Sequence, residues 1–289
     1  MQLGVGSALA LTFKALVDET ERPVSARSLC HALGVNVREQ QDAQEFRAAL
    51  FDYLTSELEP AQGQALEAPF RGKLRHRLNC PDVDFSKVWD EPFVDLPLEV
   101  KGSTSIKGAL KRFVRQEEME YRVNKEDKHR ERAVKDCRIA HAPEVLQFQL
   151  KRFAYDMESQ RMVKLGDRLS FDQELDLSPY MSDDGDSNEE TLYLLHSVII
   201  HVGDSDQGHY YSYVRTTLPT RGGWTRFDDT RVSEGVRWSQ VLSDGKGGRA
   251  SLDGVSRNAY LLQYVRRDAI PALLHYGDER GSLAADTTR

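Results

Sequence analysis

The stretch LYLLHSVIIHVGDSDQGHYYSYV, residues 192–214, carries more structural information than any other part of the chain. It begins with an apolar run typical of a β-strand over 192–201, crosses a polar loop, and continues as an aromatic strand that starts at His209. Gly208 has no side chain, so backbone or a ligand can approach the His209 imidazole closely. A single histidine at a strand start is usually structural, and its neighbours must decide its role.

Two carboxylates follow nineteen residues later, in the segment WTRFDD at 224–229. A carboxylate on a neighbouring strand can accept a hydrogen bond from one ring nitrogen of His209, which fixes the tautomer and leaves the other nitrogen to act as a base. Asp228 and Asp229 also suit a turn after a strand, where aspartate forms local hydrogen bonds. Spacing alone leaves both interpretations open.

The flanking sequence predicts helices before residue 60 and strands after it. Helical spacing of apolar residues appears over 8–17, 26–33 and 42–58, with Ser25 as the expected cap of the second helix and Gly34 as its stop. Further strands are predicted over 70–80, 92–100, 144–150 and 258–265. In 144–150, Phe148 and Leu150 alternate with Gln147 and Gln149, which predicts one solvated face. Three segments are expected to be irregular: 111–138 as a solvated helical or loop excursion, 182–190 as an acidic loop, and 243–249 as a flexible insertion.

Composition excludes several classes of protein. The 289 residues carry 39 Lys+Arg and 46 Asp+Glu, a net charge of −7, and 39% of them are hydrophobic. That hydrophobic fraction supports a folded core, whereas the acidic balance argues against a nucleic-acid binder. No apolar stretch reaches about 18 residues and the N-terminus lacks a basic signal region, so we expect no membrane contact and a nuclear or cytosolic location.

The three cysteines, Cys30, Cys80 and Cys137, are too few for a disulfide framework. None of them lies in a Cys-x-x-Cys pair, so the sequence predicts no zinc ribbon and no bound metal. All three are therefore expected to be free thiols. Whether one of them is a nucleophile becomes the main question for function.

Five segments carry a resemblance to a known family: 40–46 (QQDAQEF), 146–153 (LQFQLKRF), 208–210 (GHY), 224–229 (WTRFDD) and 258–262 (NAYLL). Their order and separations over residues 8–267 resemble the ubiquitin-specific proteases, which are cysteine deubiquitinases. The stretches 70–73 (FRGK) and 155–156 (YD), without zinc-ligand pairs, look most similar to the herpesvirus-associated branch of that family.

The resemblance implies an α+β, papain-like fold in which a thumb, a palm and fingers grip ubiquitin. The helical thumb would occupy residues 8–60, the antiparallel β palm and β fingers 61–267, and a peripheral tail 268–289. The implied activity is hydrolysis of the isopeptide bond at the C-terminal glycine of ubiquitin, without a cofactor. The implied partners are ubiquitin and ubiquitylated proteins, while the oligomeric state stays open.

The family motifs also imply roles for individual residues. His209 would be the general base, Asp228 would orient it, and Asp229 would lie beside it and help to polarise the site. The basic C-terminal tail of ubiquitin would meet the segment that contains Gln41, Asp42 and Glu45. Four further residues match positions along the substrate channel or the palm surface: Phe153, His201, Tyr210 and Tyr260.

The same resemblance implies that the nucleophile is absent from this chain. The family's cysteine and the asparagine that helps to stabilise the oxyanion lie in a box well upstream of the QQD segment. Only 39 residues precede Gln40, and they resemble the helical region that follows that box, so we expect a truncated thumb. Cys30 lies within a predicted helix without the activating turn, and Cys80 and Cys137 match no family nucleophile. Cys137 could instead remain from a lost zinc pair.

Three interpretations follow. The chain is part of a deubiquitinase whose cysteine box is missing from it, or it is a non-catalytic ubiquitin-binding module of the same fold. In the third, the missing thumb helix leaves core surface uncovered and the chain folds poorly, because each large apolar side chain exposed costs about 1.5–3 kcal/mol.

Overall fold

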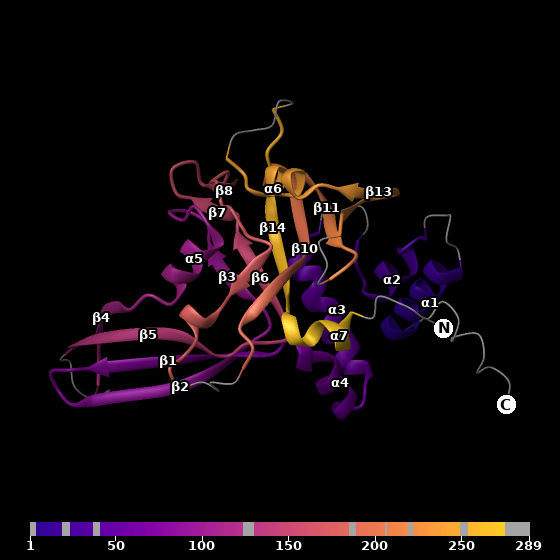
Figure 1. Cartoon of the computed structure of the whole chain (residues 1–289). Helices are drawn as coiled ribbons and strands as arrows, with labels where there is room; N and C mark the ends of the chain where they lie inside the picture. Colours follow the sequence, from indigo (N-terminus) through magenta and orange to yellow (C-terminus); the bar gives the residue numbers. More distant parts are fainter. Residues whose placement is uncertain are drawn as a thin grey trace.

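The computed structural model describes residues 4–18, 24–36, 41–123, 130–184, 189–205, 207–218, 222–248 and 254–274. The described elements form a central sheet, a second sheet that projects from it, and a group of helices on one side (Figure 1). The secondary structure is therefore α+β, as the resemblance implies. Among the described residues, no helix is long and apolar enough to cross a membrane.

The central sheet has eight strands, with β13-β12-β11-β10-β14-β6-β3 in order and β9 paired to β10. All neighbours are antiparallel except β3 and β6. The last of the described strands, β14, lies between β10 and β6 in the middle of the sheet. The bounds are β3 Leu96–Glu99, β6 Val145–Lys151, β9 Glu174–Asp176, β10 Leu192–Gly203, β11 Gly208–Arg215, β12 Trp224–Asp228, β13 Arg231–Val236 and β14 Arg257–Arg266.

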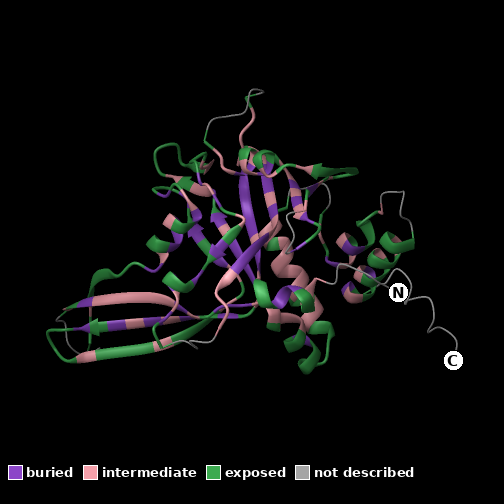
Figure 2. Ribbon diagram, viewed as in Figure 1, coloured by how far each residue is buried: buried purple, intermediate pink, exposed green. Residues whose placement is uncertain are grey.

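A four-stranded antiparallel sheet, in the order β2-β1-β5-β4, extends away from the central sheet at the lower left of Figure 1. Its members are β1 Gly72–Cys80, β2 Phe85–Phe93, β4 Glu117–Tyr121 and β5 Glu131–His141. A separate hairpin joins β7 Phe153–Asp156 to β8 Arg161–Lys164. Much of the projecting sheet is exposed, whereas buried residues concentrate in the central sheet (Figure 2).

Four helices precede the first strand: α1 Val5–Asp18, α2 Arg27–Ala32, α3 Ala43–Glu57 and α4 Pro60–Glu67. Buried side chains of α1 and α2 pack with partly buried Phe46, Leu50 and Leu54 of α3, in a cluster separate from the main core. The Glu57 carboxylate accepts hydrogen bonds from the backbone N–H groups of Val5 and Gly6, so α3 also caps α1. The outer face of α1 leaves apolar side chains exposed, among them Phe13 and Val17.

The remaining helices are short. They are α5 Ile106–Phe113, α6 Trp238–Gly245 and α7 Ile270–Leu273, with 3₁₀ turns η1 Ala68–Phe70, η2 Ser178–Tyr180 and η3 Arg267–Ala269. Val241 of α6 and Ile106 of α5 are completely buried in the main core, so both helices cover the central sheet. Ile270 of α7 is buried against Leu194 and Val265, which ties the described start of the expected tail to the sheet.

The predicted helices at 8–17, 26–33 and 42–58 are confirmed, as are the strands at 144–150, 192–201 and 258–265. The cap of the second helix is wrong: Ala26 occupies that position, and Ser25 accepts only a 3.3 Å bond from the Arg27 N–H. Gly34 does end the helix region, with φ of 69°. The single strand predicted over 92–100 is also wrong, because the end of β2 and the separate strand β3 share that range.

The excursion predicted at 111–138 is the largest error. The chain there completes α5, forms β4, and after residues 124–129, which lie outside the described residues, forms β5. Most of β4 is exposed, so both of its faces can carry charge and no alternating pattern marks it as a strand. The insertion predicted at 243–249 begins inside α6, and only part of the acidic loop at 182–190 is described, where Asp184 pairs with Arg77.

Candidate active site

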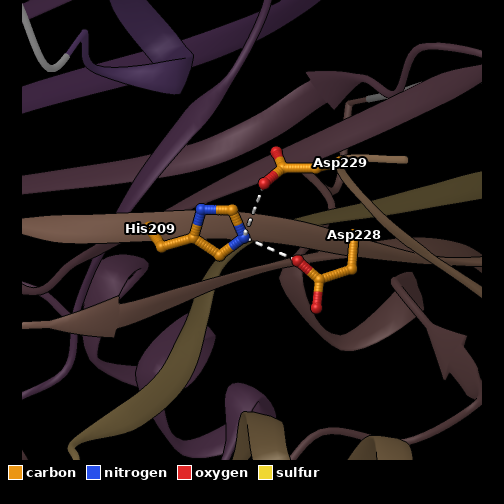
Figure 3. Close-up of side chains that lie close together, drawn as sticks. All are labelled: His209, Asp228 and Asp229. Atoms are coloured by element: carbon orange, nitrogen blue, oxygen red, sulfur yellow. Dashed lines mark hydrogen bonds and ion pairs between the residues drawn. The ribbon is translucent and has the colours of Figure 1, made fainter. Parts of the chain in front are cut away.

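His209 and Asp228 form a hydrogen-bonded pair at one end of the central sheet. His209 lies at the start of β11 and Asp228 at the end of the adjacent strand β12, and Nε2 of the histidine is 2.6 Å from Oδ1 of the aspartate (Figure 3). The His209 side chain is 43% exposed, so it can meet a substrate. Strand pairing therefore joins two groups that lie nineteen residues apart in sequence.

The charge state of Asp228 determines which nitrogen of His209 carries the proton. The pKa of Asp228 is lowered by its hydrogen bond to His209 and by the positive charge of Arg226, so the carboxylate is ionised and can only accept. Nε2 must then donate, and in the neutral imidazole Nδ1 holds a free lone pair. Figure 3 shows Nδ1 on the ring edge away from both carboxylates, which suits a base.

Asp229 lies beside this pair without bonding to it directly. Its Oδ2 is 4.0 Å from Nε2 of His209, and the side chain is 78% exposed. The backbone of Asp229 has φ of 51°, the left-handed conformation that aspartate tolerates in turns. Both interpretations of WTRFDD therefore hold together, because Asp228 contacts the imidazole while Asp229 forms the turn into β13.

Asp42 connects α3 to the central sheet. Its Oδ1 accepts hydrogen bonds from the backbone N–H groups of Gln44 and Glu45, which makes it the N-cap of α3. Its Oδ2 accepts from the Tyr260 hydroxyl at 2.6 Å and from the Tyr210 hydroxyl at 3.4 Å. This predicted tail-binding residue is therefore already fully bonded within the chain.

The four predicted channel and palm residues form one aromatic cluster. His201 contacts Phe153 and Tyr210 edge-on, at ring-centroid distances of 5.2 and 4.8 Å, and Tyr260 lies 5.7 Å from both Phe153 and Tyr210. His201 is completely buried, and burial lowers its pKa to about 4, so the ring is neutral. A Cβ on Gly208 would lie 2.2 Å from Nε2 of His201, which explains why a glycine precedes His209.

Gln41 and Glu45 flank Asp42 at the surface. Gln41 is exposed and its amide donates to the carbonyl of Asn36 at 3.4 Å, while Glu45 is exposed in the first turn of α3. Gln41 and Asp42 also line a cavity of about 450 Å³ between α3 and strands β6, β10 and β14. The predicted tail-binding segment therefore borders an open space next to the sheet that carries His209.

Several residues of this region were missed by sequence reasoning. Gln147, predicted on a solvated face, is 5% exposed at the cavity between α3 and the sheet, and its Nε2 has no hydrogen-bond partner among the described residues. Lys164 donates hydrogen bonds to the carbonyls of His201, Gly203 and Ser256, and these bonds hold the chain just before the loop that leads to His209. Arg226 binds Oδ2 of Asp228 at 2.6 Å. Only Arg226 had a sequence signal, since it lies two residues before Asp228 and therefore on the same strand face.

The three cysteines do not join this site through any contact that the structure records. Cys80 and Cys137 belong to β1 and β5 of the projecting sheet, and Cys30 belongs to α2. Burial raises the pKa of Cys137 to about 11 and that of Cys80 above its usual value, so neither thiol is activated. Cys137 instead contacts His76 of β1, with Sγ and Nε2 4.0 Å apart.

Within the described part of the chain, one group of side chains has the spacing of a metal site. The ligand atoms of His209, Asp228 and Asp229 lie within 4.8 Å of one another. However, Nε2 of His209 and Oδ1 of Asp228 already share a proton at 2.6 Å, which leaves no room for an ion between them. The arrangement fits proton transfer better than metal binding.

A helical thumb, a β-sheet palm, projecting β fingers and a histidine–aspartate pair at one end of the palm strands together define an α+β domain of papain-like type. The model of the family "Ubiquitin carboxyl-terminal hydrolase" matches residues 4–264 of this sequence, nearly all of the described chain. The chain belongs to the ubiquitin carboxyl-terminal hydrolase family, in its ubiquitin-specific protease group.

Individual relatives agree with the family match. "Ubiquitin carboxyl-terminal hydrolase 15" of Schizosaccharomyces pombe is 33% identical over 285 residues, which cover 93% of this chain and 25% of that protein. "Ubiquitin C-terminal hydrolase 12" of Arabidopsis thaliana is 30% identical over 94% of this chain and 26% of its own length. "Ubiquitin carboxyl-terminal hydrolase 7" of Drosophila melanogaster is 30% identical over 93% and 24%, respectively. The chain spans about a quarter of the length of these relatives.

Proposed function

We propose that this chain supplies the histidine–aspartate pair and the ubiquitin-binding surface of a deubiquitinase that hydrolyses the isopeptide bond at the C-terminal glycine of ubiquitin. The observation that carries the proposal is the 2.6 Å bond from Nε2 of His209 to Asp228, which leaves Nδ1 as a free base on an accessible ring edge. Membership of the ubiquitin carboxyl-terminal hydrolase family supports ubiquitin as the substrate.

In the proposed reaction, Nδ1 of His209 takes the proton of a cysteine thiol, and the thiolate attacks the carbonyl carbon of ubiquitin's last glycine. The imidazolium is stabilised by ionised Asp228, and it then gives the proton to the leaving lysine amine. A thioester remains, and water activated by the same Nδ1 hydrolyses it. Asp229, which is exposed and has its Oδ2 4.0 Å from Nε2 of His209, would help to polarise the site.

We further propose that none of Cys30, Cys80 and Cys137 is the nucleophile, and that the thiol comes from outside these 289 residues. Two of these thiols have raised pKa values in the projecting sheet, and Cys30 lies inside a six-residue helix. This proposal predicts that the chain alone binds ubiquitin without cleaving it. The lack of zinc-ligand pairs in the projecting sheet supports a place in the herpesvirus-associated branch.

The tail of ubiquitin is proposed to run past the N-terminus of α3 toward His209. Glu45 and Asp42 offer negative charge to a basic peptide, and the Phe153, Tyr210 and Tyr260 rings line an aromatic wall next to them. Because Asp42 holds two tyrosine hydroxyls in this structure, tail residues would first meet exposed Glu45 and Gln41.

The alternative is a non-catalytic ubiquitin-binding module of the same fold. It is favoured by one observation, that no cysteine among the described residues contacts His209. Both proposals expect ubiquitin binding, but they differ in what happens when a thiol is supplied.

Two measurements on the full chain and one on a chimera test these proposals. Calorimetric titration with ubiquitin should show saturable binding that weakens when ubiquitin lacks its C-terminal tail, and no binding at high micromolar concentration would overturn both proposals. Ubiquitin with a C-terminal electrophile should form no adduct, and an adduct mapped to Cys30, Cys80 or Cys137 would overturn the external nucleophile. A chimera that adds a family cysteine box should hydrolyse a fluorogenic ubiquitin substrate and lose activity on His209→Ala; a chimera that binds but never cleaves favours the module.

A further inference from the structure

We propose that Arg226 is a positioning residue that holds Asp228 in the orientation needed to bond His209, and that α6 in turn holds Arg226 through Tyr211. This inference rests on the proposed role of His209 as a base. It assigns a function to a side chain that meets neither the imidazole nor, in the proposed reaction, the substrate.

The first contact is with the catalytic pair itself. Oδ1 of Asp228 accepts from Nε2 of His209 at 2.6 Å, and Oδ2 accepts from Nη2 of Arg226 at 2.6 Å. A carboxylate with only one bonded oxygen can turn about its terminal torsion, whereas one bonded at both oxygens is fixed. The Asp228 side chain is 24% exposed, so water would compete for a freed oxygen.

The second contact fixes Arg226. Its guanidinium carbon lies 4.1 Å from the centre of the Tyr211 ring, a cation–π contact from the neighbouring strand β11. The Tyr211 hydroxyl donates to Oδ2 of Asp244 in α6 at 2.8 Å, and the Tyr213 hydroxyl donates to the same oxygen at 2.7 Å. Burial and the Asp244 charge raise the pKa of Tyr211, so the phenol stays protonated and keeps donating.

These contacts form a continuous path from α6 to His209, through Asp244, Tyr211, Arg226 and Asp228. The path contains the carboxylates of Asp244 and Asp228 and the guanidinium of Arg226. The imidazole of His209 and the exposed carboxylate of Asp229 lie at its end. The guanidinium of Arg226 offers positive charge to Asp228, and its stacking on the Tyr211 ring adds a contact that orients its plane. Substitutions can therefore separate the effect of the position of Arg226 on Asp228 from the effect of its charge.

The test is nitrogen NMR of the histidine rings in the full chain, because the shifts of Nδ1 and Nε2 report which nitrogen carries the proton. In the unsubstituted chain, His209 should be almost entirely the Nε2–H tautomer. In Arg226→Gln, the preference for that tautomer should fall about tenfold, the scale of one charge-assisted hydrogen bond. Arg226→Lys keeps the charge and one donor and should restore part of the preference.

Arg237→Gln is the matched control, since Arg237 is an exposed arginine at the start of α6 whose recorded bonds use only its backbone. It should leave the His209 tautomer unchanged. Tyr211→Leu removes the ring that holds Arg226 and should weaken the preference as Arg226→Gln does, whereas Tyr211→Phe keeps the ring and should have the smaller effect.

An unchanged His209 tautomer in folded Arg226→Gln would overturn the proposal, as would a stronger Nε2–H preference, which would mean that Arg226 acts only by its charge. Chemical-shift spectra of the other histidines show whether each variant is folded. The NMR measurement requires neither ubiquitin nor a nucleophile. The role of Arg226 can therefore be overturned while ubiquitin binding is observed, and ubiquitin binding can be absent while the role of Arg226 holds.

Discussion

The carboxylate of Asp42 and the hydroxyl of Tyr260 meet at 2.6 Å although 218 residues separate them. The same carboxylate caps α3, so a single side chain fixes both the start of the thumb helix and its contact with β14. In Figure 1, α3 lies next to β14 and β10, and no other thumb helix shares a recorded side-chain hydrogen bond with the central sheet within the described ranges. The position of the thumb therefore depends strongly on Asp42.

Asp42→Ala should lower the free energy of unfolding by about 1–3 kcal/mol, because it removes a helix cap and leaves a tyrosine hydroxyl without its acceptor. Tyr260→Phe should cost less, about 0.5–1.5 kcal/mol, because the cap remains. Urea unfolding measures both. Asp52→Ala, an exposed change on α3, is the control and should lie within about 0.5 kcal/mol of the unsubstituted chain. Equal losses for Asp42→Ala and Asp52→Ala would contradict the assignment.

Buried His201 should make stability depend on pH. Its folded pKa of about 4 lies below the ordinary value near 6.5, so the unfolded state binds more protons between these limits. The contribution of neutral His201 is complete above pH 6.5 and is lost as pH falls toward 4. Unfolding free energies at pH 7 and pH 5 should therefore differ less in His201→Leu than in the unsubstituted chain, by about 1–2 kcal/mol. An identical pH dependence in the two proteins would rule this out.

Gly208→Ala should displace the strand start that carries His209. The new Cβ would lie 2.2 Å from Nε2 of His201 and 2.7 Å from the Val202 carbonyl oxygen, and the backbone oxygen cannot move freely. We expect a loss of about 1–3 kcal/mol by thermal unfolding. A second substitution, His201→Ala, should recover part of that loss when the two are combined. Independent, additive effects of the two substitutions would show that the clash is not the cause.

Lys164→Met should loosen the loop before His209. Its ammonium donates to the carbonyls of His201, Gly203 and Ser256, and methionine leaves all three without that donor. Hydrogen exchange of residues 201–205 should become at least several-fold faster. Lys151→Met removes an exposed lysine that pairs with Glu99 and is the control. Exchange that stays slow in Lys164→Met would mean that strand pairing alone holds the loop.

The thiols should differ in their reaction with iodoacetamide at pH 7.5. Cys80 is completely buried, and burial raises the pKa of Cys137 to about 11, so both should react slowly. Cys30 is partly exposed and should react first. Mass spectrometry of labelled peptides over time gives the order. Fast labelling of Cys137 that is blocked by ubiquitin would contradict its exclusion as a nucleophile.

Local pattern predicted those elements that bury one continuous apolar face. The strands at 192–201 and 258–265 are recognisable because they lie in the core of the central sheet, and helix 42–58 because its apolar residues repeat at helical spacing. Strands β2, β4 and β5 carry charge on both faces, since the projecting sheet is only partly covered. They form strands because they pair with one another and with β1, and the pattern within one short segment does not reveal that pairing.

The candidate site divides in the same way. Residue type, spacing and motif resemblance were enough to select His209 and Asp228, because a histidine and an acid on consecutive strands can meet only in a few ways. The partners of Asp42 could not be predicted, because Tyr210 and Tyr260 reach it across 168 and 218 residues. Gln147 was misplaced since alternation reports one face of a sheet and says nothing of a helix that covers the other.

The place of β14 has a consequence for synthesis of the protein. Among the strands of the central sheet, Arg257–Arg266 leaves the ribosome last, yet it pairs with both β10 and β6 in the middle of that sheet. Until it emerges, the nascent chain presents two apolar strands with open edges, the kind of surface that aggregates or recruits chaperones. Translation that stops before residue 257 should therefore leave the central sheet without its middle strand. The expected product is a polypeptide that aggregates or is bound by chaperones.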